Sequence, residues 1–212
     1  MVRLGIMLSS VRSVLPVLIC CVCRAQDSPP QPETIPTFGT TVVIPSGLRG
    51  QIYNIKSRTR RLPNFEKLKP VGAIYTTTLN VPTRNFSEGF PGVTNRFEWF
   101  AIDYDGKFWI EKPGDYKFSL LSDDGAKLYI DDDVVVDNDG IHPPATVDGS
   151  VTLSGGIHRI RVSYFQGPRF QVALVLSVAA TGEPARVFST DDFKPPPNPE
   201  DWKYNTTPKK DP

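Results

Sequence analysis

Apolar and polar side chains alternate along the central part of the chain, and this pattern restricts it to short β-strands. The alternation is clearest in residues 115–121 and 126–130, where every second side chain is apolar. Successive side chains of a strand point to opposite faces, so the pattern predicts two half-buried strands. Between them lie Asp123, Asp124 and Gly125, a composition typical of a turn. Two adjacent carboxylates repel each other unless a cation or water screens them, which makes this turn the first candidate site.

The same pattern recurs over residues 40–180 and predicts one domain. Further strands are expected at 40–44, 48–55, 96–102, 107–110, 157–165 and 170–178, with a turn at Asp103-Tyr104-Asp105-Gly106. No long segment has the periodicity of an amphipathic helix. The sequence therefore predicts an all-β fold, an antiparallel β-sandwich or barrel of about ten short strands.

The two ends of the chain differ in composition from its centre. Residues 1–25 have early arginines, an apolar run and small residues near Ala25, as in a secretory signal peptide. A disordered N-terminus is the alternative. Residues 26–39 and 181–212 hold many of the 21 prolines, so we expect a disordered tether and a disordered polar tail.

Cysteine and charge narrow the class of protein further. All 3 cysteines lie within 1–25, so cleavage would leave a secreted, periplasmic or envelope domain without disulfides. A lipid anchor on one of them is the alternative to free secretion. The chain has 24 Lys and Arg against 23 Asp and Glu, which argues against nucleic-acid binding. No transmembrane segment is expected after cleavage.

Basic residues gather in one segment, 56–69, which contains Lys56, Arg58, Arg60, Arg61, Lys67 and Lys69. Leu62, Phe65 and Leu68 recur there at helix-like spacing, so a short helical turn or a surface loop fits. A solvated loop is the favoured interpretation. A surface for acidic glycans or lipid headgroups is the alternative.

Several segments resemble one known family. They are Gly47-Leu48-Arg49-Gly50-Gln51-Ile52-Tyr53, residues 113–118, residues 122–131, residues 135–140 and residues 156–162. Together they resemble the protective-antigen-type domain of anthrax protective antigen, fungal flocculins and bacterial secreted glycosidases, over residues 47–178. The resemblance implies a β-sandwich that binds glycans or cell-surface polysaccharide. It also implies that Asp123 and Asp124 chelate calcium across a cis peptide bond, with sugar hydroxyls completing the metal shell.

The late loop that would complete such a site is 166–169, and it departs from the family pattern. Fungal adhesins supply an asparagine there, whereas this chain has Gln166 and Arg169, which would contact the ligand. Arg169 could also place a positive charge where the cation should lie. Asn138 and Asp139 are other candidate oxygen donors for the metal.

Two interpretations of the turn at residues 123–125 therefore remain. Either Asp123 and Asp124 hold calcium, or their side chains bond to the backbone of the turn while Gly125 takes a positive φ. The aspartates at 131–133 and 137–139 fit hairpin turns better than an EF-hand loop.

Other residue types give weaker signals. His142 and His158 are isolated, so surface or structural roles are favoured over a zinc site or a catalytic triad. Trp99 and Trp109 are expected in the core, and stacking on sugar rings is the alternative for them and for Tyr129.

These observations favour a secreted, non-catalytic carbohydrate-binding module, with calcium as its candidate cofactor. The alternative is a structural or protein-interaction domain of the cell envelope with neither metal nor sugar site. A glycoside hydrolase is disfavoured, because one complete domain leaves no segment for a catalytic partner.

Overall fold

The computed structural model describes residues 47–94 and 96–198. The expected signal peptide, the tether and the expected strand at 40–44 lie outside these residues. In the described part, no helix is long and apolar enough to cross a membrane.

Strands dominate the described residues, and each is joined to the next by a turn or loop. Two single-turn 3₁₀ helices, η1 (Phe65–Lys67) and η2 (Phe86–Glu88), interrupt them. The strands are β1 (Gly47–Asn54), β2 (Gly72–Thr76), β3 (Asn80–Asn85), β4 (Phe100–Ile110), β5 (Gly114–Asp123), β6 (Ala126–Ile130), β7 (Asp133–Asn138), β8 (Ala145–Leu153), β9 (Gly156–Gln166), β10 (Gln171–Ala180) and β11 (Arg186–Val187).

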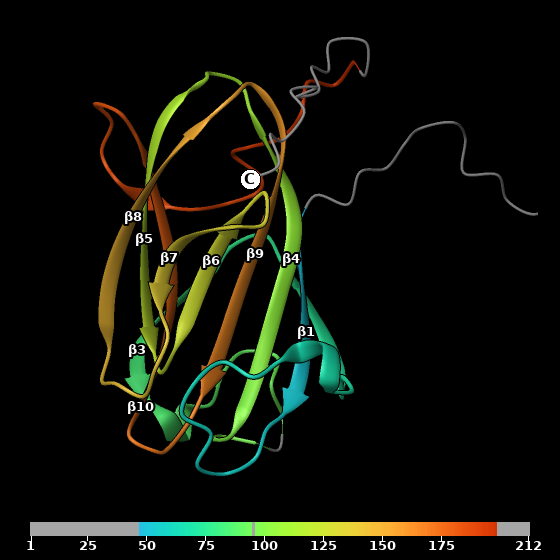
Figure 1. The fold of residues 1–212 in the computed structure, drawn as a ribbon, viewed down its shortest axis with the longest axis vertical. Coiled ribbons are helices and arrows are strands. Elements are labelled where there is room, and N and C mark those ends of the chain that lie inside the picture. Colours follow the sequence, from blue (N-terminus) through green and yellow to red (C-terminus); the bar gives the residue numbers. More distant parts are fainter. Residues whose placement is uncertain (1–46, 95, 199–212) are drawn as a thin grey trace, which may run out of the picture. The chain divides into compact units, whose positions relative to one another are not determined.

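These strands form two sheets that pack face to face (Figure 1). One sheet has six strands in the order β2-β1-β4-β9-β6-β7. The other has the order β11-β10-β5-β8, and β3 also pairs with β10. Every pairing is antiparallel, and neither sheet closes on itself. The predicted antiparallel β-sandwich is confirmed, and the barrel alternative is not.

Side chains that face inward from both sheets fill one hydrophobic core. Alternate residues of β4, among them Phe100, Ile102 and Tyr104, meet Phe118 and Leu120 of β5 there. Burying one such side chain contributes roughly 1.5–3 kcal/mol. The alternation seen in the sequence is therefore the source of the sandwich.

One predicted turn is wrong. Asp103-Tyr104-Asp105-Gly106 lies inside β4, which continues without a break to Ile110. The two aspartates point to the outer face of the sheet, where Asp103 accepts a hydrogen bond from Ser163 (2.6 Å) on the neighbouring strand. A charged outer face combined with one glycine imitated the composition of a turn.

The expected polar tail begins with a packed segment. Phe188, just after β11, is fully buried in the core, and Phe193 stacks on it with ring centroids 5.3 Å apart. The backbone N–H of Trp109 donates to the Phe193 carbonyl (2.7 Å). The sandwich thus uses residues beyond position 180.

The basic segment 56–69 runs as a loop across the outer face of the six-stranded sheet (Figure 1). Leu62, Phe65 and Leu68 pack there against a second buried cluster formed by Ile55, Ala101 and Phe165, together with the partly buried Trp99. The helix-like spacing produces a single turn, η1. Trp109 is 6% exposed, so a core position is confirmed for it.

Candidate functional site

The turn between β5 and β6 lies at the end of the sandwich where β9 ends and β10 begins (Figure 1). The peptide bond between Asp123 and Asp124 is cis, as the family resemblance implies. Gly125 does not take a positive φ. Its role is spatial, because a Cβ atom there would lie 2.5 Å from a ring carbon of Phe165 and 2.6 Å from the nitrogen of Gly140.

Asp124 holds three loops together. One carboxylate oxygen accepts the backbone N–H of Gly167 (2.7 Å), and the other accepts the backbone N–H of His142 (3.3 Å). The residue is only 3% exposed. Burial raises the pKa of Asp124, and the two hydrogen bonds oppose that rise. The side-chain-to-backbone bonds expected of a turn are therefore present, and they reach across to other loops.

Asp123 lies beside it and is also buried. Its backbone carbonyl accepts a hydrogen bond from the hydroxyl of Tyr164 (2.7 Å). Burial, followed by the charge of Asp124, raises the pKa of the Asp123 carboxyl to about 7, while His142 and Gln166 lower it. Two adjacent acidic groups thus occupy a place where water screens their charges poorly.

Gln166 stabilises this turn through buried hydrogen bonds. Its side chain is fully buried, its Oε1 atom lies 2.6 Å from the Tyr164 hydroxyl, and its amide donates to the Gln171 carbonyl (3.0 Å). These contacts fix the start of β10 relative to the end of β9. Gln166 therefore acts on the site by positioning.

Arg169 is engaged elsewhere than at the aspartate pair. Its Nε atom lies 3.3 Å from a carboxylate oxygen of Glu98, and its guanidinium group lies over the ring of Phe86. The structure thus places the positive charge of the late loop against Glu98.

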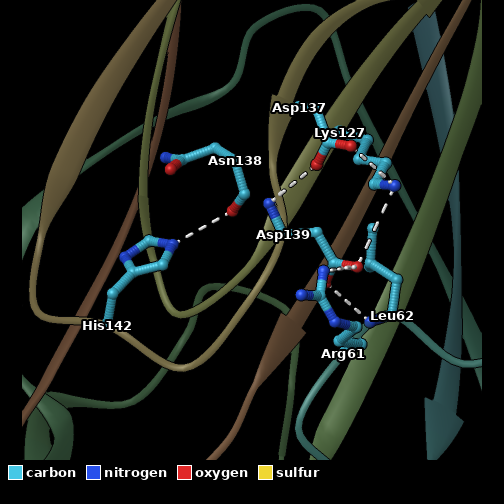
Figure 2. A network of polar contacts seen from close by, with 7 residues as sticks. All are labelled: Arg61, Leu62, Lys127, Asp137, Asn138, Asp139 and His142. Carbon is cyan, nitrogen blue, oxygen red and sulfur yellow. Dashed lines mark hydrogen bonds and ion pairs between the residues drawn. The ribbon is translucent and has the colours of Figure 1, made fainter.

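The other two candidate metal ligands, Asn138 and Asp139, bond to other groups, and Figure 2 shows the partners of Asp139. The amide of Asn138 donates to the Ser122 hydroxyl and to the Ala145 carbonyl, both at 2.9 Å. The Asp139 carboxylate accepts the backbone N–H of Leu62 (2.8 Å). It also lies 3.7 Å from Arg61 and 4.0 Å from Lys127, so its charge is offset without a metal.

His142 contacts both Asp124 and Asn138, and little in the sequence indicated this role. One ring nitrogen lies 3.0 Å from the Asn138 carbonyl and the other lies 2.9 Å from the Pro143 carbonyl. The only hint in the sequence was the pair of prolines that follows and stiffens the loop.

Calcium prefers oxygen ligands, and the donors at this turn are of that type. Asp123 and Asp124 supply two buried carboxylates, both with a raised pKa. Within residues 47–94 and 96–198, no cluster of three or more His, Cys, Asp or Glu side chains forms a metal cage. The residues thus fit a cation that takes its remaining ligands from carbonyls, water or a bound molecule.

A pocket of about 370 Å³ lies near the β4–β5 turn, away from the aspartate pair. Its lining includes Trp109, Tyr116 and the segment that carries Arg186. Arg186 is ion-paired to Asp192 (2.7 Å), and this contact holds residues 186–192 together beside the pocket.

Comparisons with known proteins agree with this geometry. The sequence model of the PA14 domain family matches residues 46–191. No curated protein matches the chain in sequence.

Solved structures share the fold. The PA14 domain of the MpAFP antifreeze protein is 19% identical, with a TM-score of 0.59 over 69% of this chain and 88% of that one. A PA14 sugar-binding domain from an RTX adhesin is 16% identical, with a TM-score of 0.56 over 68% and 96%. The epithelial adhesin 9 A domain of Candida glabrata, solved with Galβ1-3GlcNAc, is 15% identical, with a TM-score of 0.50 over 69% and 87%.

Proposed function

The chain belongs to the PA14 domain family, and on that premise we propose that it is a non-catalytic carbohydrate-binding module. We further propose that Asp123 and Asp124 hold a calcium ion and that the loops around them receive a sugar. The expected signal peptide at 1–25 would place this module outside the cytoplasm.

The observation that carries the proposal is the pair of adjacent, buried carboxylates at the loop end of the sandwich. Burial makes each negative charge costly, and their proximity adds repulsion. A divalent cation bound to both would offset these costs, and its preference for oxygen ligands suits the pair.

Two structural neighbours support the sugar assignment by their own properties. The RTX adhesin domain is described as sugar-binding, and the Candida glabrata domain was solved in complex with a galactose-containing disaccharide. These are properties of those proteins, and the proposal extends them to a chain that shares their fold.

In the proposed site, bound calcium would supply a fixed positive charge to which sugar hydroxyls bind. Asp123 and Asp124 would hold it, and Asp124 also orients the two neighbouring loops through the N–H groups of Gly167 and His142. Gln166 holds the late loop in place through the hydrogen bond from its amide to the Gln171 carbonyl. The late loop has no asparagine, so the remaining ligands would be backbone carbonyls, water and the sugar.

Calorimetric titration of the EDTA-treated protein with calcium tests the metal site. We expect saturable binding that is lost in Asp123→Asn and in Asp124→Asn. The matched control is Asp105→Asn, which removes one exposed carboxylate from the outer face of β4 and should leave calcium binding intact.

A glycan array probed with and without calcium tests the ligand. Retention of a glycan class only in calcium supports the proposal. If neither calcium nor any glycan binds or raises the melting temperature, the proposal fails and the structural or protein-interaction role takes its place.

A further inference from the structure

The loop at 56–69 carries a concentrated positive charge. It holds six basic side chains, all exposed, and a single acidic one, Glu66. Among the described residues, the sole ion pair of these six is that of Arg61 with Asp139, at 3.7 Å. The other cations are Lys56, Arg58, Arg60, Lys67 and Lys69. They therefore remain available to an anionic partner.

Buried contacts fix this loop in place. Leu62, Phe65 and Leu68 pack into the second apolar cluster, and the backbone N–H of Leu62 donates to the Asp139 carboxylate (2.8 Å). That carboxylate, only 6% exposed, also faces Arg61 and Lys127 (Figure 2). Because the backbone is ordered by folding, less conformational freedom is lost when a ligand binds the cations.

The same loop borders the candidate site. It begins after Ile55, whose N–H donates to the Trp99 carbonyl (3.1 Å), and the Trp99 N–H donates to the Gln166 carbonyl (2.9 Å). On the other side, Asp139 precedes Gly140, whose backbone lies against Gly125 of the aspartate turn. Two short routes thus connect the basic loop to the turn that holds Asp123.

We propose that the loop at 56–69 is an anion-binding platform and that the glycan of this module is acidic, bearing sulfate or carboxylate groups. This inference rests on the proposed glycan-binding function and specifies its ligand class. Arginine and lysine side chains pair with such groups through charge-assisted hydrogen bonds. A glycan bound at the aspartate turn would extend over this loop, where its acidic groups would meet the basic side chains.

The apolar side chains of the loop favour a glycan over a membrane surface. Leu62, Phe65 and Leu68 pack against the sheet, so they are not available to enter a bilayer. Peripheral membrane binding needs such apolar groups on the outside in addition to basic ones.

Dextran sulfate and neutral dextran of equal length provide a matched pair of probes. With calcium present, we expect the full protein to bind dextran sulfate more tightly than dextran, and the preference to shrink as salt rises. The triple variant Lys56→Gln, Arg60→Gln, Lys67→Gln should weaken this binding by about tenfold.

The control removes the same charge at the other end of the strands, with Arg49→Gln, Lys107→Gln and Lys112→Gln. It should retain nearly all binding, and circular dichroism and melting curves should show both triple variants folded. An equal loss in both variants would mean attraction to net charge alone and would overturn the platform. Tighter binding to phosphatidylglycerol vesicles than to dextran sulfate would overturn the glycan assignment.

Measurements of calcium binding distinguish a failure of this inference from a failure of the proposed function on which it rests. If calcium and neutral glycans bind but dextran sulfate is not preferred, the platform is wrong and the proposed function stands. If dextran sulfate binding depends on the platform while calcium and all other glycans fail to bind, the calcium-dependent function is wrong. Unchanged calcium binding by the platform variant is the expected result.

Discussion

Replacing Asp123 with asparagine is expected to stabilise the metal-free protein above pH 7. In the folded chain, burial and the charge of Asp124 raise the pKa of Asp123 to about 7, whereas an ordinary aspartate titrates near 3.8. Between these pH values the folded chain binds a proton that the unfolded chain has released. The free energy of unfolding therefore falls as pH rises from about 4 to about 7, and the loss is complete above that range.

The size of this effect follows from the separation of the two pKa values. About three pH units at 1.36 kcal/mol each set a ceiling of about 4 kcal/mol. The asparagine amide is itself a polar group that would be buried at this position, at a cost of about 1–3 kcal/mol, so we expect a net gain of about 2 kcal/mol. For a domain of this size, that raises the melting temperature by about 4–8 °C.

Urea unfolding in EDTA from pH 4 to pH 8.5 measures this difference. Wild type and Asp123→Asn should agree near pH 4 and diverge as pH rises, with equal m-values. A smaller slope remains in the variant, because burial also raises the pKa of Asp124. Asp105→Asn serves as the control and should follow wild type.

Two results would refute this reasoning. One is a wild-type stability that does not change between pH 4 and pH 7. The other is an Asp123→Asn variant that is less stable than wild type at pH 8 in EDTA. The same samples in millimolar calcium test the proposed site, because wild type should gain stability and the variant should not.

Three further substitutions probe the packing around the site. Asn138→Ala removes a buried amide that donates to the Ser122 hydroxyl and the Ala145 carbonyl, and urea unfolding should show a loss of about 2–4 kcal/mol. Phe188→Ala empties a fully buried position beyond residue 180, so calorimetry should show a loss of about 3–5 kcal/mol, whereas a true tail residue would cost almost nothing. Gly149→Ala would place a methyl carbon 1.9 Å from the backbone oxygen of Val135; we expect a loss of about 3 kcal/mol or more, and a melting temperature equal to wild type would contradict this contact.

The sequence predicted the sandwich because its core residues alternate. Segments such as 115–121 and 157–165 place their apolar side chains on one face, and those faces form the core. The prediction from sequence was wrong where polar residues on the outer face of a strand had the composition of a loop. Asp103 and Asp105 suggested a turn, yet both belong to one long strand whose charged face has partners on the neighbouring strand. Residue spacing within a single strand does not show what the adjacent strand supplies.

The candidate site was predictable in its centre and not in its surroundings. Asp123 and Asp124 were singled out from local sequence and from the family resemblance, and the structure has the implied cis peptide between them. The partners of Asn138, Asp139 and Arg169 come from segments distant in sequence. No local pattern announces that Asp139 meets Leu62, a residue 77 positions away, or that Arg169 meets Glu98.

Asp124 accepts hydrogen bonds from backbone N–H groups of its two neighbouring loops, which leaves the side chains of these loops free to vary. Because the anchor uses no side chain of either loop, residues 141–144 and 168–170 can change identity without loosening it. Within these two loops, contact with the Asp124 carboxylate itself restricts position 167, where a Cβ atom would lie 3.0 Å from a carboxylate oxygen. Descendants of one ancestral chain can therefore acquire new ligand preferences by ordinary point substitution, while the buried turn is inherited unaltered.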